Sequence, residues 1–312
     1  MKVIFIGGSS RSGTTLLDVM LGGLDGFFSL GEMYHVWERG FIENELCGCG
    51  TPFLTCGFWE AVTRSAFGDP ESVSPHGILR LARRVQRIKF IPQMLCRKLR
   101  TSSYAAAWDE YSSILERLYS SIAMHSNASY LIDSSKAPAY GFMLNSIPAL
   151  DVYVIHIVRD SRAVAYSWQR KKIRPEIHWE TQYMPRAGLV GSTSEWLISN
   201  SLNSLLGASA AGYICVRYED LAMNPEGILA TLVDWLDLDL SLVSHVVTDG
   251  SVTLRPNHTV SGNPVRFREG KVPIVLDDAW RSQLNPWKKA LVLAGTWPLQ
   301  SYCRYRAAGP MR

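Results

Sequence analysis

The feature that most constrains the fold of this chain is a glycine-rich turn near its start. An apolar run, Val-Ile-Phe-Ile, occupies residues 3–6, and the pattern Gly-x-x-x-x-Gly-Thr-Thr follows from Gly8 to Thr15. A strand, a glycine turn and a helix in this order are typical of a nucleotide phosphate loop, in which backbone N–H groups and a helix N-terminus face an anion. The turn predicts an α/β fold that binds a phosphate group.

The turn departs from an NTPase loop at one position. Thr14 stands where NTPases have the lysine that reaches the terminal phosphates, and Arg11 lies inside the loop instead. The missing lysine argues against a Mg-bound triphosphate. We therefore predict that Arg11, Ser12, Gly13, Thr14 and Thr15 bind a phosphate ligand of another kind.

Composition limits the remaining possibilities. The chain has 312 residues, of which 47% are hydrophobic and 19% are charged, so it can form a large core and is not a disordered chain. A net charge of +4 fits an anionic ligand, and we expect no nucleic-acid partner. Neither a signal peptide nor an apolar run of about 18 residues is evident, so a cytoplasmic location is expected.

Apolar strands alternate with helical segments along the chain. Further strands are expected at 27–30, 129–133, 151–158 and 213–217. Helices are expected at 14–24, 105–125, 193–211 and 225–236. Two more helices are expected, one that starts at 136–138 and one that follows residues 159–162 and ends at about 172. This order predicts a three-layer, P-loop NTPase-like fold with a central, mainly parallel sheet flanked by helices. We expect a single domain over residues 1–312, with a cap inserted at about 33–128.

Four residues with functional side chains stand at the ends of these strands. They are Glu32, Lys136, Arg159 and Tyr218. Because parallel sheets bind ligands at the carboxyl ends of their strands, we expect all four to converge beside the glycine-rich loop.

A second motif lies after the longest apolar strand. Arg159 ends this strand, and Ser167 follows eight residues later, two turns into the next helix. An arginine and a hydroxyl in this position can hold a second phosphate. With the loop, the pair resembles the PAPS-dependent sulfotransferases, which bind the 5′-phosphosulfate with an Arg-Ser-Gly-Thr-Thr loop and the 3′-phosphate with an arginine and a serine eight residues apart.

The resemblance implies further contacts with PAPS, the sulfuryl donor, and with PAP, its product. Tyr218 matches a tyrosine that lies by the adenine, and residues 258–270 match a loop that closes over the nucleotide. Arg266 and Arg268 are both candidates for the basic contact from this loop, because Glu269 stands where cytosolic relatives have lysine. The resemblance implies no metal requirement.

The resemblance also implies catalytic roles. Glu32 in the pair Gly31-Glu32 matches the glutamate base of tyrosylprotein sulfotransferases, and a partly desolvated carboxylate suits that role. Lys136 resembles the lysine that contacts the transferring sulfonate, and Arg11 completes the catalytic set. Residues 133–138 lack the histidine base of small-molecule cytosolic members. His156 lies inside an apolar strand and is expected to be a core residue.

The acceptor is expected to bind between the region after Glu32 and residues 171–192. Aromatic residues there, with neighbouring Trp168, suit sugars, phenols and lipids equally. A carbohydrate or glycolipid hydroxyl is the leading prediction, and an amine, a lipid or a small molecule is an alternative. The basic stretch at 80–100 is either a solvated helix face or a peripheral contact with a membrane or an acidic acceptor.

Cys47, Cys49 and Cys56 cluster in one glycine-containing loop. Three interpretations are open: a zinc site with His35 as the nearest fourth ligand, a disulfide between Cys56 and one of the other two, and reduced thiols packed under neighbouring aromatics.

Two other functions are compatible with the motifs. An atypical P-loop kinase or NTPase could use the strand end at Asp133 to bind Mg²⁺. A non-catalytic nucleotide-binding protein of the same fold would have Glu32 and Lys136 turned away from the cleft.

Overall fold

A five-stranded parallel sheet forms the centre of the computed structural model, which describes residues 1–69 and 73–306. The strands lie in the order β2-β3-β1-β4-β5, and every neighbouring pair is parallel. Their bounds are β1 (Lys2–Gly8), β2 (Phe27–Gly31), β3 (Tyr130–Lys136), β4 (Asp151–Val158) and β5 (Gly212–Arg217). The predicted α/β class and the parallel sheet are confirmed.

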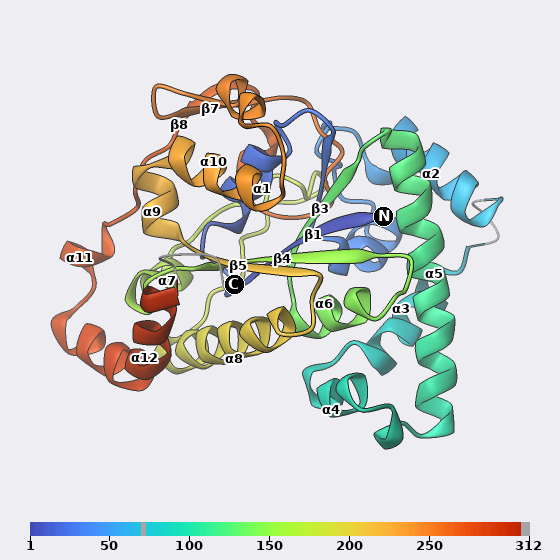
Figure 1. Ribbon diagram of the computed structural model, residues 1–312, viewed down its shortest axis with the longest axis horizontal. Coiled ribbons are helices and arrows are strands. Elements are labelled where there is room, and N and C mark those ends of the chain that lie inside the picture. Colours follow the sequence, from blue (N-terminus) through green and yellow to red (C-terminus); the bar gives the residue numbers. More distant parts are fainter. Residues whose placement is uncertain (70–72, 307–312) are drawn as a thin grey trace.

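Helices cover both faces of this sheet (Figure 1). One face carries α1 (Thr14–Leu21), α9 (Tyr218–Met223) and α10 (Pro225–Trp235). The other face carries α6 (Pro138–Asn145), α7 (Ser161–Gln169), α8 (Leu189–Gly207) and α12 (Pro286–Arg306). The three predicted layers are therefore present.

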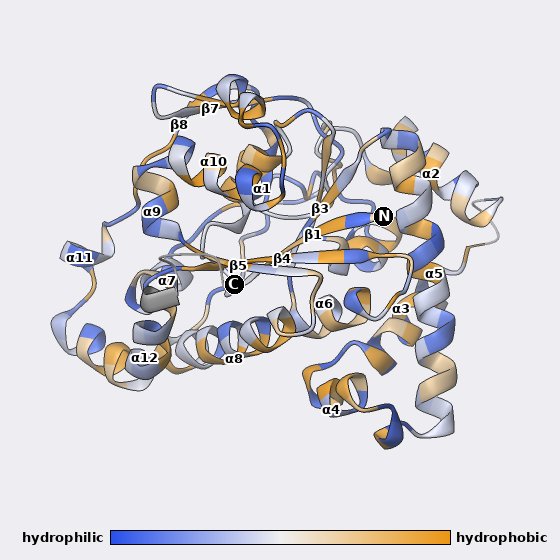
Figure 2. Ribbon diagram, in the orientation of Figure 1, coloured by the Kyte–Doolittle hydropathy of each residue, from blue (hydrophilic) through white to orange (hydrophobic). Residues whose placement is uncertain are grey.

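The central strand explains this arrangement at the level of residues. Val3, Ile4, Phe5 and Ile6 are all fully buried, as expected for a strand covered on both faces. Because successive side chains point to opposite faces, Ile4 and Ile6 join the core under α1 and Val3 and Phe5 join the other core. Figure 2 shows hydrophobic residues concentrated along β1.

The segment at 33–128 contributes α2 (Gly57–Phe67), α3 (Pro75–Val85), α4 (Ile91–Leu95) and α5 (Ser102–Ser126), which lie beside the sheet. Its buried aromatic residues share a core with the strand residues Val3 and Phe5. Helix α3 ends at Val85, and Pro92 lies in the first turn of α4, where its missing N–H costs no hydrogen bond.

Several elements were not predicted. A small antiparallel sheet contains β6 (Val247–Thr248), β7 (Ser251–Leu254) and β8 (Gly270–Pro273), and a π-helical segment covers Val36–Ile42. The remaining helix is α11 (Trp280–Gln283), and 3-10 turns cover Met33–His35, Phe53–Thr55, Ile88–Phe90, Arg97–Leu99, Leu240–His245 and Pro264–Phe267. Among the described residues, no helix is both long and apolar enough to cross a membrane.

Candidate functional site

The glycine-rich loop joins β1 to α1 and leaves a set of backbone amides free. The loop bends through left-handed conformations at Arg11 (φ 69°) and Gly13 (φ 94°). Within the described residues, the amides of residues 11–15 donate to no protein acceptor, whereas the Ser10 amide donates to Glu195 Oε1 at 2.9 Å. Free amides at a helix N-terminus form a site for an anion.

Gly13 is required by its surroundings as well as by its backbone conformation. A Cβ atom at this position would lie 2.4 Å from Cδ2 of Tyr218.

We expect Gly13→Ala to lower the free energy of unfolding by about 1–3 kcal/mol, because the ring must move and the residue keeps a positive φ. Chemical denaturation measures this. Gly57→Ala is the control, because nothing lies within 4 Å of a Cβ there. Equal stability of the two variants would contradict the packing that we describe.

Arg159 connects the end of β4 to this loop. Its Nη1 atom donates to the Arg11 carbonyl at 3.2 Å, and its Nη2 atom donates to the Asp277 carbonyl at 2.6 Å. The guanidinium lies 4.3 Å from the centroid of the Tyr218 ring, and the buried Nε atom has no hydrogen-bond partner among the described residues. The predicted residues Arg11, Gly13, Arg159 and Tyr218 are therefore contiguous.

Further cations surround Arg159 that the sequence analysis did not identify. Arg170 Nη1 and Arg159 Nη2 each lie 3.3 Å from Asp277 Oδ2. Burial lowers the pKa of Lys172, and the nearby charges of Arg11 and Arg170 lower it further. Asp277 offsets only part of this positive charge, so the cluster favours an anion.

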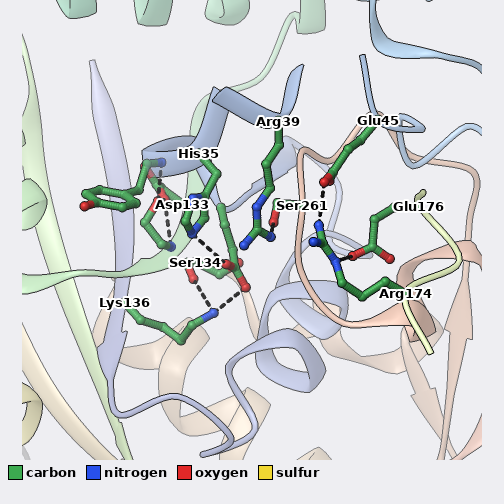
Figure 3. A network of polar contacts seen from close by, with 12 residues as sticks. His35, Arg39, Glu45, Asp133, Ser134, Lys136, Arg174, Glu176 and Ser261 are labelled. Atoms are coloured by element: carbon green, nitrogen blue, oxygen red, sulfur yellow. Dashed lines mark hydrogen bonds and ion pairs between the residues drawn. The ribbon is translucent and has the colours of Figure 1, made fainter. Parts of the chain in front are cut away.

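A second polar group lies at the ends of β2 and β3, where Lys136 donates to Glu32 (Figure 3). The side chains of Glu32 and Lys136 are each only 14% exposed. Lys136 Nζ also donates to the Ser134 carbonyl at 3.4 Å, and His35 Nε2 lies 3.8 Å from Glu32 Oε2. The predicted base and the predicted sulfonate-binding lysine thus form one ion pair that is largely shielded from solvent.

The backbone at Gly31 brings the late segment of the chain next to Glu32. Gly31 has φ 73°, and a Cβ atom there would lie 2.5 Å from the Val260 carbonyl. The Glu32 amide donates to that carbonyl at 2.7 Å, and the Val260 amide donates to the Leu30 carbonyl at 2.8 Å. Glycine therefore permits the close approach that fixes the backbone of Glu32.

Electrostatic interactions keep Glu32 ionised. Burial acts to raise its pKa, but the charges of Lys136 and Arg39 and the hydrogen bond from Lys136 oppose this effect, and the net shift is downward. Burial and the charge of Arg39 lower the pKa of His35 to about 3, so His35 is neutral at physiological pH. Partial burial lowers the pKa of Arg11 in the phosphate loop, and the charge of Glu32 opposes this shift, so the ion pair lies near the loop.

Other predicted cofactor residues occupy different environments. Ser167 is 4% exposed on α7, Thr14 is 4% exposed, and Ser12 Oγ donates to the Ser9 carbonyl at 2.6 Å. Arg266 is buried and donates to the Thr259 and Leu46 carbonyls. Arg268 is exposed near the C-terminal end of α1, in a hollow that also includes Val19 and Phe28. The Arg266 side chain lies close to Glu32, because a Cβ atom on Gly262 would lie 3.9 Å from Arg266 Cδ and 3.8 Å from Glu32 Oε1.

A network that includes further ion pairs extends from Glu32 toward the segment at 171–192 (Figure 3). Arg39 donates to Ser261, and Arg174 binds both Glu45 and Glu176. The sequence analysis did not identify this network or Glu195. The residues that interact come from distant parts of the chain and belong to no recognisable motif.

Two residues weighed in the sequence analysis belong to the core. Asp133 accepts hydrogen bonds from the Tyr119 hydroxyl and from the amide and hydroxyl of Ser135, and burial raises its pKa to about 6. His156 is fully buried, with its Nε2 atom 2.9 Å from Asn200 Oδ1. The interpretation of His156 as a core histidine is confirmed.

The cysteine loop meets a different histidine from the one that its sequence suggested. Cys47, Cys49 and Cys56 lie around His258, whose Nδ1 atom is 3.3 Å from Cys56 Sγ. His35 faces Glu32 instead. Sequence distance favoured His35, whereas the contact with His258 spans 202 residues and depends on the fold.

Comparison with known proteins places the fold and the family of this chain. The sulfotransferase domain of the Synechococcus PCC 7002 olefin synthase has a TM-score of 0.51 and 24% sequence identity, with 96% of this chain and 94% of that chain covered. The sulfotransferase domain of the curacin biosynthetic pathway has a TM-score of 0.51 and 18% identity, with 94% and 96% covered. Both show a shared fold. No curated protein sequence matches the chain. The sequence model of the sulfotransferase family matches residues 3–241, and the chain therefore belongs to the sulfotransferase family.

Proposed function

We propose that the protein transfers a sulfuryl group from PAPS to a hydroxyl or amine of an acceptor and releases PAP. The observation that carries this proposal is the juxtaposition of free loop amides at residues 11–15 with Arg159 and its cationic neighbours. A donor with phosphate groups at both ends of its ribose needs two adjacent anion sites. The loop amides suit the 5′-phosphosulfate, and Arg159 with Ser167 suits the 3′-phosphate.

The unpaired Nε atom of Arg159 supports this assignment. A buried guanidinium N–H without an acceptor is costly, and an anion beside it would satisfy it. Tyr218 packs against both Gly13 and Arg159, which fits a position beside the adenine. When bound, PAPS supplies an activated sulfuryl group whose leaving group is a phosphate.

The Glu32–Lys136 pair supplies the two chemical functions that sulfuryl transfer needs. Glu32 is ionised and takes the proton from the acceptor hydroxyl as the new S–O bond forms. Lys136 offsets the negative charge that develops as the bond to the leaving phosphate breaks. When Lys136 interacts with that phosphate, the ion pair between Lys136 and Glu32 weakens, and Glu32 becomes a stronger base.

The position of Asp133 argues against a kinase-like site. Its carboxylate is buried and engaged by Tyr119 and Ser135, so it is not free to bind Mg²⁺ at the strand end. Thr14 in place of the loop lysine points the same way.

Arg159→Ala is expected to weaken PAP binding roughly 10- to 150-fold. Hydrogen bonds to a charged group contribute about 1.5–3 kcal/mol, which corresponds to this range. Calorimetric titration measures the change. Arg162→Ala is the matched control, because the Arg162 guanidinium, at the start of α7, is held by Asp160. Equal affinities for PAP in the two variants would remove Arg159 from the nucleotide site.

We also propose a carbohydrate or glycolipid acceptor that enters over the insertion at 33–128 and the segment at 171–192. Trp179 and Tyr183 in that segment are 50% and 45% exposed, which suits stacking on a sugar ring or a lipid. Glu32 stands between the phosphate loop and this insertion in the chain.

A membrane contact through residues 80–100 fits this acceptor class. Arg84 and Arg87 are exposed, and the same stretch of the chain exposes Ile88, Leu95 and Leu99 by 51%, 52% and 55%. Each basic residue near an anionic membrane surface contributes about 1 kcal/mol to the free energy of binding.

We expect the double variant Arg84→Glu, Arg87→Glu to bind phosphatidylserine vesicles at least about tenfold more weakly than the wild type. Cosedimentation measures this, with Arg64→Glu on α2 as control. Equal binding by the wild type and the double variant, or no binding by the wild type, would refute the contact.

Transfer of labelled sulfate tests the proposed reaction. The purified protein is incubated with sulfur-labelled PAPS and a panel of glycans, glycolipids and small hydroxyl compounds. We expect a labelled product together with PAP. Phosphate transfer from ATP to the same panel, with none from PAPS, would support the kinase alternative.

A further inference from the structure

Three thiols and one imidazole meet between the insertion and the late segment of the chain. Cys49 Sγ lies 3.7 Å from Cys56 Sγ, and His258 Nδ1 lies 3.7 Å from Cys47 Sγ and 3.3 Å from Cys56 Sγ. All four atoms lie within 4.8 Å of one another. Cys47 and Cys56 are buried, and all three thiols are free. A compact, largely buried set of four donor atoms results.

Three of the separations between these atoms, 3.3, 3.7 and 3.7 Å, are close to those in a tetrahedral zinc site. With Zn–S bonds of about 2.3 Å and Zn–N bonds of about 2.0–2.1 Å, tetrahedral ligand atoms lie about 3.5–3.8 Å apart. A disulfide would need two sulfur atoms at about 2.05 Å. The 3.7 Å between Cys49 and Cys56 fits the first geometry and not the second.

The backbone holds the thiol loop against the histidine independently of any ion. The Gly48 amide donates to the Thr259 carbonyl at 3.0 Å, and a Cβ atom on Gly48 would lie 1.9 Å from Asn257 Oδ1. The Gly50 amide donates to the Cys47 carbonyl at 2.8 Å and closes a tight turn around the thiols. Two segments about two hundred residues apart are thus brought close together.

Neighbouring aromatic side chains orient the imidazole. The His258 ring stacks on Phe58, with ring centroids 4.8 Å apart and an interplanar angle of 13°. Trp59 Nε1 donates to the His258 carbonyl at 2.9 Å. With Nδ1 directed at the thiols, the ring is placed as a metal ligand rather than as a packing residue.

We propose that Cys47, Cys49, Cys56 and His258 bind one Zn²⁺ ion in a structural site. Four protein ligands complete a tetrahedral coordination shell and leave no position open for water or substrate, so the ion takes no part in sulfuryl transfer. The three thiols release their protons when the ion binds, and a reduced loop is required.

The ion would fix the segment that carries His258. Two residues later, Val260 pairs with the backbone on both sides of Gly31 and so holds the amide of Glu32. A zinc ion at His258 therefore stabilises the wall of the site beside Glu32 without touching substrate. This role is independent of which donor or acceptor the protein uses.

Metal analysis of the wild-type protein provides the first test. The protein is purified without chelator or affinity tag, and zinc is measured by plasma mass spectrometry. We expect about one zinc ion per chain. After removal of zinc, Co²⁺ should restore the intense visible bands and the thiolate charge-transfer band of a tetrahedral sulfur site. This measurement needs no variant and no enzymatic activity.

Matched variants assign the ligands. Cys49→Ser and His258→Asn are expected to lower zinc affinity at least about tenfold. Cys96→Ser is the control, because Cys96 is an exposed thiol outside the cluster. Its zinc content should equal that of the wild type.

Three results would overturn the proposal. One is reduced wild-type protein that folds but binds neither Zn²⁺ nor Co²⁺. The other is an intact mass two hydrogens lower under non-reducing conditions with no metal bound, which would show a disulfide in the loop. Zinc retained equally by Cys49→Ser and Cys96→Ser would assign the ion to other residues.

Discussion

Glu32→Gln is expected to lower turnover by about 10²- to 10⁴-fold while leaving PAP affinity within about threefold of the wild type. Glutamine has the shape of glutamate but cannot take the acceptor proton. Glu32 is not among the residues that we assign to the nucleotide, so PAP binding should survive. The measurement is steady-state sulfuryl transfer together with calorimetric titration of PAP.

Glu38→Gln is the control for this substitution. Glu38 lies six residues away and is paired with Arg83 at the surface. Its turnover should be that of the wild type. If Glu32→Gln retained full turnover with any acceptor, Glu32 would not be the base. If Glu32→Gln lost PAP binding as well, the role of Glu32 would be to maintain the structure of the site.

Lys136→Met is expected to lower turnover by about 10²- to 10³-fold, which is the usual effect of losing a group that stabilises developing negative charge. Methionine keeps much of the length of lysine and removes the charge. The effect should appear in kcat, because Lys136 acts most strongly as the leaving group separates. Lys289→Met is the control, because that amine donates to the Arg281 carbonyl at the surface.

The same variant should move the pH dependence in a defined direction. In the wild type, Glu32 has a lowered pKa, so kcat/KM should stay constant as pH falls until it is below the usual glutamate range. Without Lys136, burial becomes the stronger influence and raises the pKa of Glu32, so the acidic limb should shift to higher pH. A lower rate with an unshifted acidic limb would show that Lys136 does not control Glu32.

The sheet was predictable because its strands carry their own signals. The apolar residues 3–6 and 151–158 read as buried strands, and the structure has β1 and β4 there. The end of α1 was less predictable. It stops at Leu21, because two glycines follow, whereas apolar periodicity alone extended it to residue 24.

The candidate site was predictable where a residue directly follows a strand. Glu32 and Lys136 were expected to converge, and their ion pair follows from the parallel order of β2 and β3. Asp277, Glu195 and His258 could not be found in this way. Each contacts its partners because a helix or loop from a distant part of the chain packs there. A single sequence carries no local signal for such contacts.

Calorimetric titration with PAP and with ATP, in the absence and presence of Mg²⁺, tests the central claim most directly. A sulfotransferase with the site described above should bind PAP tightly without Mg²⁺ and should bind ATP weakly under both conditions. Arg159→Ala should weaken the binding of PAP roughly 10- to 150-fold and so reduce the preference for PAP, and Arg162→Ala should preserve that preference. Mg²⁺-dependent binding of ATP with no response to PAP would contradict the account.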